Sequence, residues 1–130
     1  MATVSGSSRP LRLAINGYGR IGRCFLRALY ERGLEQHFQV VAINEPAKAD
    51  SIAYLTRFDS THGRFPVPVA LDGETLSIDG RSIALTHATR PEAVDWRGLD
   101  IDLLVECSGH YSDRSALEGF IAAGCPRVLL

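Results

Sequence analysis

Residues 11–45, LRLAINGYGRIGRCFLRALYERGLEQHFQVVAINE, contain the pattern that decides the fold. Apolar side chains alternate along residues 11–16, as in a strand, and a glycine-rich turn follows at once over residues 17–22. The apolar positions of residues 21–32 have helical spacing, and residues 38–45 form a second apolar run that ends in an acid. This order predicts a strand, a tight turn, a helix and a second strand.

The turn has the spacing Gly-x-Gly-x-x-Gly at Gly17, Gly19 and Gly22. In a dinucleotide-binding turn the first glycine allows the sharp bend, the second lets a pyrophosphate lie against bare backbone, and the third lets the helix pack closely. Free amides near Arg20 and Ile21 would face an anion, which a helix N-terminus favours by about 0.3–1 kcal/mol. The turn therefore predicts a diphosphate site, and a purely structural glycine turn is the alternative.

An acidic residue follows the second predicted strand. Glu45 lies 23 residues after Gly22, close to the spacing of about 20 at which a carboxylate meets the adenine-ribose hydroxyls. Because this carboxylate would repel a 2′-phosphate, it favours NAD over NADP as the cofactor. Two alternatives stay open: Glu45 as a solvated loop residue, and Lys48 as a cation that neutralises a phosphate.

The charge balance excludes some classes of partner. The chain has 130 residues with Lys+Arg 14 and Asp+Glu 15, a formal net charge of −1. General attraction to nucleic acid or to an acidic membrane surface is not expected, and no apolar stretch is long enough to span a bilayer. Residues 1–10 are small and polar, which predicts a disordered lead before a single domain at 11–130.

The three cysteines indicate reduced thiols. Cys24, Cys107 and Cys125 are odd in number and lack metal-ligand spacing, which predicts no metal site and a cytoplasmic location. Cys107 ends an apolar run, so we interpret it as a buried, inert thiol rather than a nucleophile.

The middle of the chain departs from simple strand–helix alternation. Residues 49–58 predict a short helix that buries Ile52, Ala53 and Leu55. Residues 67–85 then contain three alternating apolar runs separated by two Asp-Gly pairs. Two such turns predict a three-stranded antiparallel meander, inserted where a crossover helix would otherwise stand.

The parallel pattern resumes near the C-terminus. Residues 101–107 predict a strand covered on both faces, Ser112 is placed to cap a helix over 113–123, and residues 127–130 begin another strand. The predicted fold is α/β: a Rossmann-type parallel sheet with helices on both faces and an inserted antiparallel meander. Because such a sheet binds ligand beyond its carboxyl edge, residues 17–22, Glu45 and residues 108–111 should converge on one crevice.

Four segments in this order resemble the NAD-binding domain of glyceraldehyde-3-phosphate dehydrogenase and its relative erythrose-4-phosphate dehydrogenase. They are INGYGRIGR at 15–23, AINEP at 42–46, FDSTHGRF at 58–65 and ECSG at 106–109. Together with the glycine pattern, the resemblance implies NAD as cofactor and three sets of binding residues. These are Asn16, Gly17, Gly19, Arg20, Ile21 and Gly22 around the pyrophosphate, Glu45 at the ribose, and Ser108, Gly109 and Tyr111 near the adenine or the end of the fourth parallel strand.

The resemblance also points to a substrate class. Glyceraldehyde enzymes usually have aspartate where this chain has Glu45, and residues 28–31 and 121–124 are more similar to the erythrose branch. We therefore expect a parent enzyme that oxidises erythrose 4-phosphate, with glyceraldehyde 3-phosphate as the other candidate. Such enzymes are usually homotetramers, so homo-oligomerisation is expected.

The family's catalytic residues are not in this sequence. Its chemistry uses a cysteine thiohemiacetal formed in a Ser-Cys-Thr-Thr-Asn stretch with a later histidine base, and no such stretch occurs in the 130 residues. We expect that the catalytic domain is absent, that the chain holds no catalytic residue and that it binds NAD without turnover. A stand-alone NAD-binding or sensing module is the alternative.

Overall fold

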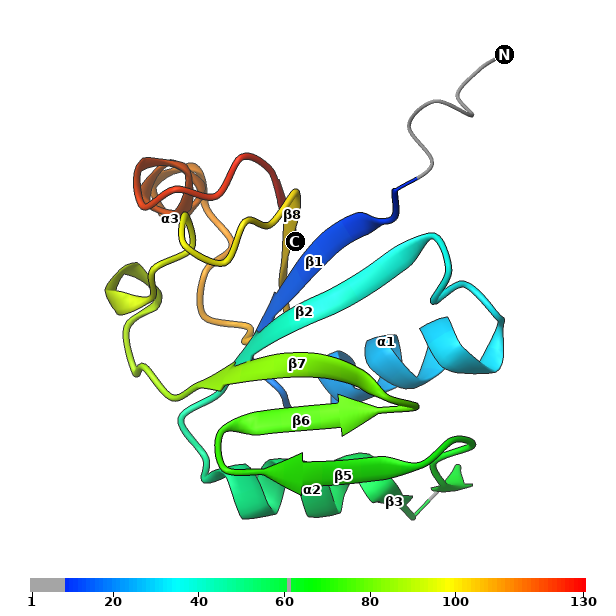
Figure 1. The fold of residues 1–130 in the computed structure, drawn as a ribbon. Helices are drawn as coiled ribbons and strands as arrows, with labels where there is room; N and C mark the ends of the chain where they lie inside the picture. Colours follow the sequence, from blue (N-terminus) through cyan, green and yellow to red (C-terminus); the bar gives the residue numbers. More distant parts are fainter. Residues whose placement is uncertain (1–8, 61) are drawn as a thin grey trace.

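A seven-stranded sheet forms the centre of the computed structural model, which describes residues 9–60 and 62–130 (Figure 1). Its strands are β1 (Leu11–Asn16), β2 (Phe38–Asn44), β5 (Val69–Asp72), β6 (Thr75–Ile78), β7 (Arg81–Thr86), β8 (Leu103–Glu106) and β9 (Val128–Leu129). The strand order is β5-β6-β7-β2-β1-β8-β9. β1 lies between β2 and β8 and is parallel to both, which confirms the predicted Rossmann-type core.

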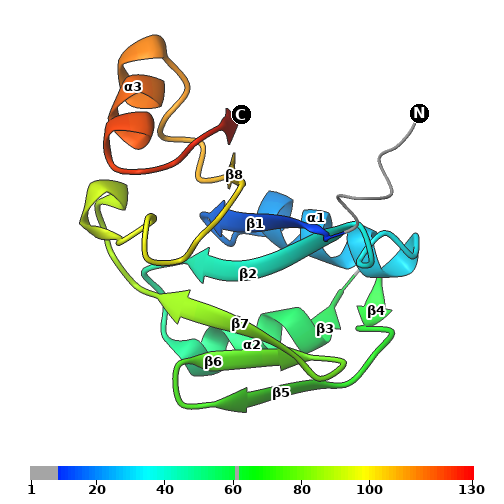
Figure 2. The ribbon, with the colours of Figure 1, turned by 45° about the horizontal axis from the view of Figure 1, so that its top comes forward.

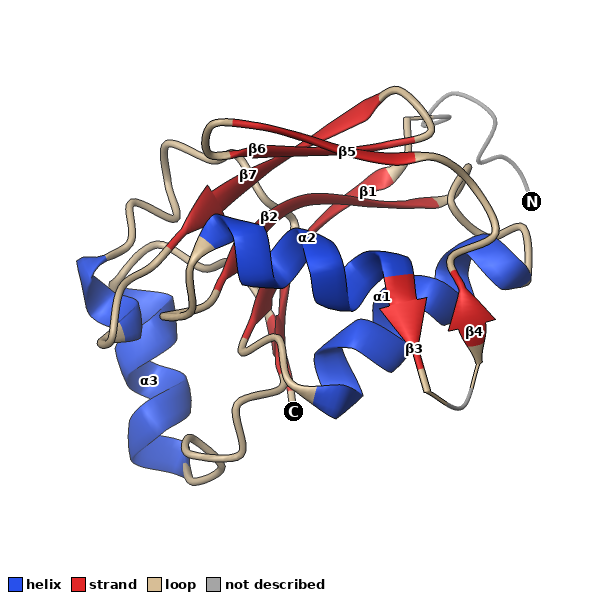
Figure 3. Cartoon of the chain, turned by 90° about the horizontal axis from the view of Figure 1, so that it is seen from below, coloured by secondary structure: helices blue, strands red, loops and turns tan. Residues whose placement is uncertain are grey.

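Helices cover both faces of this sheet, as predicted. α1 (Arg20–Glu31) and α2 (Ala49–Arg57) lie side by side on one face (Figure 3), and α3 (Arg114–Ala122) lies on the other. Alternation along β1 explains the two cores: Leu13 and Ile15 pack with α1 and α2, whereas Ala14 packs with Trp96 and Phe120. Both faces of β1 are therefore buried, as in other parallel sheets.

The predicted meander is present but is continuous with the parallel sheet. β5, β6 and β7 pair antiparallel, and positive φ angles at Gly73 and Gly80 form the two turns. β7 also lies beside β2 and is parallel to it (Figure 2). In this pair Asn44 is opposite Thr86. The third strand of the meander thus brings its carboxyl end to the same edge as β1 and β2.

Helix faces were predicted less well than helix positions. Ile21 is 69% exposed, whereas Arg27 on the same helix is 4% exposed. The Arg27 guanidinium is buried because it donates to the carbonyls of Gly63 and Arg64 in the small hairpin of β3 (Phe58–Asp59) and β4 (Gly63–Arg64). In α2, Leu55 is exposed where burial was predicted.

The start of α3 also differs from the prediction. Asp113, not Ser112, is the N-cap residue, because its carboxylate accepts a hydrogen bond from the backbone N–H of Ala116. The apolar side chains of α3 are only partly buried: Phe120 is 4% exposed, and Ile121 is 53% exposed.

The predicted lead over 1–10 lies mostly outside the described residues, which begin at Arg9. The Arg9 guanidinium donates to Asp102 at 2.8 Å beside β1. Across residues 9–60 and 62–130, the helices are all too short or too polar to cross a membrane.

Candidate functional site

The carboxyl ends of β1, β2, β7 and β8 border a cleft of about 350 Å³. Six of the residues predicted to bind a dinucleotide line it: Asn16, Gly17, Gly19, Glu45, Ser108 and Tyr111. Arg20, Ile21 and Gly22 lie beside it in the first turn of α1, and Gly109 lies in the exposed loop after β8. The structure therefore brings the predicted segments to one edge of the sheet.

The glycines of the turn occupy three different environments. Gly17 has φ +92° and packs so closely on Ser108 that a Cβ would lie 2.5 Å from the Ser108 Cα. A Cβ on Gly22 would lie 2.5 Å from the Gly17 carbonyl oxygen, so this glycine lets α1 start close against the turn. A Cβ on Gly19 would meet no protein atom within 4 Å. Space beside bare backbone at Gly19 fits a pyrophosphate.

The N-terminus of α1 is exposed from Gly19 to Ile21. No side chain within the described residues caps this helix, whose N-cap is Gly19. The first N–H groups of an α-helix have no intrahelical partner, and the helix dipole makes them attractive to an anion. The backbone of the turn can therefore hold a diphosphate without a contribution from a charged side chain.

Glu45 links the glycine turn to the loop after β2. One carboxylate oxygen accepts from the backbone N–H of Tyr18 at 2.8 Å, and the other accepts from Ala47 N–H at 3.1 Å. Each carboxylate oxygen has two lone pairs, so both retain the capacity to accept a ribose hydroxyl. The side chain is thus oriented at the cleft before any ligand arrives.

A row of buried and half-buried polar side chains crosses the carboxyl edge beneath the cleft. The Thr86 hydroxyl donates to Asn44 Oδ1, Asn44 Nδ2 donates to Asn16 Oδ1, and Asn16 Nδ2 donates to Glu106 Oε1 at 2.6 Å. The second Glu106 oxygen accepts from both the backbone N–H and the hydroxyl of Ser108. This network joins the ends of four strands and fixes the floor of the cleft.

Sequence reasoning missed Asn44 and Glu106 as site residues, although both were quoted in motifs. The available signal was their position. Each is the last residue of its strand, where a polar side chain meets the binding edge of a parallel sheet. Glu106 is only 8% exposed, and its charge is satisfied by neutral donors instead of a cation.

Ser108 and Tyr111 are both held in place by contacts within the protein. The Ser108 hydroxyl donates to Glu106 and accepts from His110 N–H at 3.2 Å, so it fixes the loop after β8. The Tyr111 ring packs edge-on against Phe120 of α3, with ring centroids 5.7 Å apart. Tyr111 therefore presents an aromatic wall to the cleft from a fixed position.

Cys107 lies at the cleft but is a poor nucleophile. Burial raises the pKa of its thiol, and the neighbouring Glu106 carboxylate raises it further. A thiol with a raised pKa holds little thiolate at neutral pH. The raised pKa agrees with the prediction of an inert cysteine, but the side chain is half-buried at the cleft and not buried as predicted.

Comparison with protein families identifies the family of this domain. The family model described as "Glyceraldehyde 3-phosphate dehydrogenase, NAD binding domain" matches residues 11–114. The matched range includes the glycine turn, Glu45 and the loop after β8, which are the parts of the chain that form the cleft.

Proposed function

Because the chain belongs to the family of glyceraldehyde 3-phosphate dehydrogenase NAD-binding domains, we propose that it binds NAD in the cleft at the carboxyl ends of β1, β2 and β8. NAD is the cofactor of the matched domain, and the family implies an oxidoreductase as the parent protein. The observation that carries the proposal is the uncapped start of α1 beside the open face of Gly19.

In this proposal the pyrophosphate lies against the turn and the first residues of α1. Asn16, Gly17 and Gly19 border it from the turn, Arg20 and Ile21 supply backbone N–H groups, and Gly22 keeps the helix close. The exposed Arg20 side chain adds a positive charge at the same end of the helix. Ser108, Gly109 and Tyr111 border the cofactor from the loop after β8.

Glu45 contacts the adenine-ribose in this proposal and selects against a 2′-phosphate. Its support is the fixed orientation of the carboxylate, which two backbone N–H groups hold at the cleft. Lys48 is exposed and follows in the same loop, but a negative carboxylate in direct contact with the ribose outweighs one exposed cation. We therefore expect NAD to bind more tightly than NADP.

We further propose that the parent enzyme oxidises a sugar-phosphate aldehyde, with erythrose 4-phosphate as the preferred substrate over glyceraldehyde 3-phosphate. Bound NAD would serve as hydride acceptor for that reaction. The support for erythrose 4-phosphate is the glutamate at position 45 and the similarity of residues 28–31 and 121–124 to that branch.

In this proposal the chain itself binds NAD and does not catalyse the reaction. No Ser-Cys-Thr-Thr-Asn stretch occurs among its 130 residues, so the nucleophilic cysteine would come from a catalytic domain. A cytoplasmic, homo-oligomeric enzyme is part of the same proposal. The free thiols of Cys24, Cys107 and Cys125 support a reducing location.

Titration calorimetry with NAD and with NADP tests the cofactor assignment. Glu45→Ala should weaken NAD binding by roughly tenfold, because a hydrogen bond to a charged acceptor is lost, and should reduce the preference over NADP. Glu118→Ala, an exposed acid on α3, is the matched control and should bind like wild type. Equal wild-type affinities for the two cofactors would defeat the role of Glu45. Absence of NAD binding to the folded chain would defeat the proposed function.

A further inference from the structure

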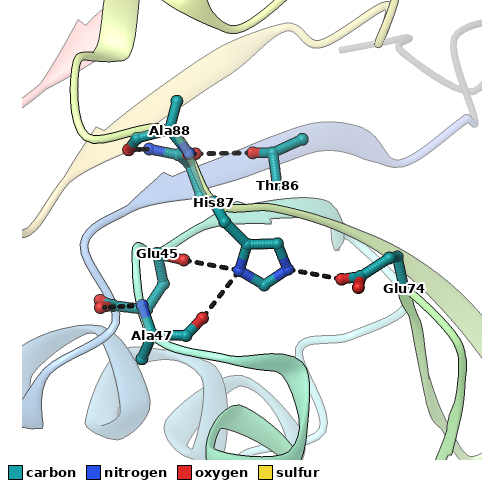
Figure 4. A network of polar contacts seen from close by, with 7 residues as sticks. Glu45, Ala47, Glu74, Thr86, His87 and Ala88 are labelled. Carbon is teal, nitrogen blue, oxygen red and sulfur yellow. Dashed lines mark hydrogen bonds and ion pairs between the residues drawn. The ribbon is translucent and has the colours of Figure 1, made fainter.

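His87 follows β7 and reaches across to the loop that carries Glu45 (Figure 4). Its Nδ1 lies 2.9 Å from the Glu45 carbonyl oxygen and 2.7 Å from the Ala47 carbonyl oxygen. On the other side of the ring, Nε2 faces the Glu74 carboxylate in the turn between β5 and β6. One imidazole thus connects three segments of the chain.

Both nitrogens of this ring face acceptors. A neutral imidazole has one N–H, so its other nitrogen would direct a lone pair at an oxygen. Only the imidazolium donates from both sides and satisfies every contact in the group. The hydrogen bond to Glu74 and those to the Glu45 and Ala47 carbonyls raise the pKa of His87 above its ordinary value, against a smaller lowering by burial.

The segment that His87 holds is also held from the cleft side. The Glu45 carboxylate accepts from Tyr18 N–H and Ala47 N–H, while the Glu45 and Ala47 carbonyls turn the other way, toward His87. His87 does not line the cleft; it borders a separate hollow between the starts of α2 and β6. It can therefore orient Glu45 without contacting a ligand.

We propose that protonated His87 is a positioning residue, which holds residues 45–47 in the geometry that lets the Glu45 carboxylate receive the adenine-ribose. This rests on the proposed function, because it assigns a role toward the NAD that Glu45 binds. NAD affinity is then highest when His87 is charged. Since the charged form is present below the raised pKa, the affinity falls as the pH rises through that pKa.

The charges around the imidazole come from two further elements. Glu74 favours the imidazolium, and its own backbone carbonyl accepts from Leu85 N–H, which anchors the turn beside β7. Lys48 and Asp50, at the start of α2, border the same hollow and have opposite effects on the imidazolium. The Glu45 carboxylate points to Tyr18 on the far side of the loop. Glu74 is the only carboxylate shown in direct contact with the ring among the described residues.

Calorimetric NAD titrations over a series of pH values, from below the ordinary pKa of histidine to well above it, test the proposal, because the pKa of His87 is raised. Wild type should lose roughly threefold to tenfold in affinity across the range, as the charge-assisted hydrogen bonds to the loop are lost. His87→Gln should bind with the weaker affinity at every pH. Glu74→Gln should bind like wild type at the lowest pH and lose affinity at a lower pH than wild type, because the pKa of His87 falls without the carboxylate.

Two further measurements distinguish a positioning role of His87 from a purely structural one. The ring resonance of His87 should titrate at the same pH as the NAD affinity, and NAD binding near that pH should take up protons, as measured in buffers of different ionisation enthalpy. His37→Gln is the matched control: this exposed histidine precedes β2 at the opposite end of the sheet, and its loss should leave the profile unchanged.

The outcomes distinguish this proposal from the proposed function. Tight NAD binding with the same affinity at every pH, or a pH profile that survives His87→Gln, would overturn the role of His87 and leave the NAD site intact. A folded wild type that binds no NAD at any pH would remove the proposed function itself. Should His87→Gln fail to fold, the shift of the Glu74→Gln profile decides the matter alone.

Discussion

At the scale of single residues, Gly17 and Gly19 have separate roles, and alanine substitutions should separate them. Gly17 combines φ +92° with contact to the Ser108 backbone, where a Cβ would lie 2.6 Å from the Ser108 nitrogen. Gly17→Ala should therefore lower the free energy of unfolding by about 2–4 kcal/mol, through backbone strain and a clash that backbone atoms cannot relieve. Urea unfolding measures this loss.

Gly19→Ala is the counterpart of that variant. Gly19 has φ −78°, which any residue adopts, and a Cβ there meets no protein atom within 4 Å. We expect a change in unfolding free energy of less than about 1 kcal/mol, together with a loss of NAD affinity as the methyl group enters the proposed pyrophosphate position. Unchanged NAD affinity in a stable Gly19→Ala chain would contradict the placement of the pyrophosphate.

Tyr18, between these glycines, makes the stability sensitive to alkaline pH. Burial raises the pKa of Tyr18 from 10.0 to about 12, and its hydroxyl forms a 2.6 Å hydrogen bond with Thr56. Because the unfolded chain ionises first, Tyr18's contribution to stability is complete below its unfolded pKa and is lost as the pH rises through its folded pKa.

Tyr18→Phe should remove that pH dependence and lower the free energy of unfolding only slightly. Near neutral pH the lost hydrogen bond should lower the free energy of unfolding by about 0.5–1.5 kcal/mol. Between about pH 10 and about pH 12 the stability of the variant should fall less steeply than that of wild type. Urea unfolding at both ends of the range gives the comparison. Tyr54→Phe, at a tyrosine that is 61% exposed, should decline as wild type does. Parallel curves for Tyr18→Phe and wild type would contradict the role of Tyr18.

At the scale of elements, α3 offers a test of which residue starts the helix. Asp113 Oδ1 accepts from Ala116 N–H at 2.8 Å, so Asp113→Ala should cost about 0.5–2 kcal/mol of unfolding free energy. Ser112→Ala, at the neighbouring exposed position, should change it by less than about 0.5 kcal/mol. Hydrogen exchange at the Ala116 amide should quicken in the first variant alone. Equal losses of unfolding free energy in the two variants would contradict the assignment of the cap to Asp113 instead of Ser112.

The elements themselves were largely predictable, because apolar periodicity and glycine turns are local properties of the chain. The face that each helix buries was less so. Ile21, in the first turn of α1, is exposed, whereas Arg27 is buried because the hairpin of β3 and β4 offers carbonyls to its guanidinium. Those partners are more than thirty positions away in the sequence, and helical spacing alone carries no information about them.

The candidate site was likewise only partly predictable from the sequence. Gly17, Glu45 and Ser108 were found from local motifs and the rule that parallel strands bind ligand at their carboxyl edge. The contacts of Glu106 with Asn16 and of His87 with the Glu45 loop depend on strand order: β8 beside β1, and β7 beside β2. The meander was predicted as an insertion, and nothing in the sequence pattern placed its third strand beside β2. The contacts of His87 with the Glu45 loop were therefore not predicted.

At the scale of the whole molecule, the sheet has two edge strands with different character. β5 is the outer strand of the meander, and β9 lies at the other edge, where it pairs with β8 alone among the described strands. Leu129 on β9 is 51% exposed, and Ile121 on the neighbouring α3 is 53% exposed. An exposed parallel edge with apolar side chains tends to recruit another chain, so we expect self-association through β9.

Charge placed on that edge should prevent the association. Leu129→Lys should raise the dissociation constant of the self-associated form by roughly tenfold or more, because edge lysines oppose strand pairing between like chains. Ala70→Lys is the matched control: it puts the same charge at an exposed position of β5, the opposite edge, and should associate as wild type does. Light scattering over a concentration series measures all three chains. A wild type that stays monomeric at high concentration would contradict the prediction, and an equal loss of association in both variants would show that net charge, rather than the β9 edge, controls it.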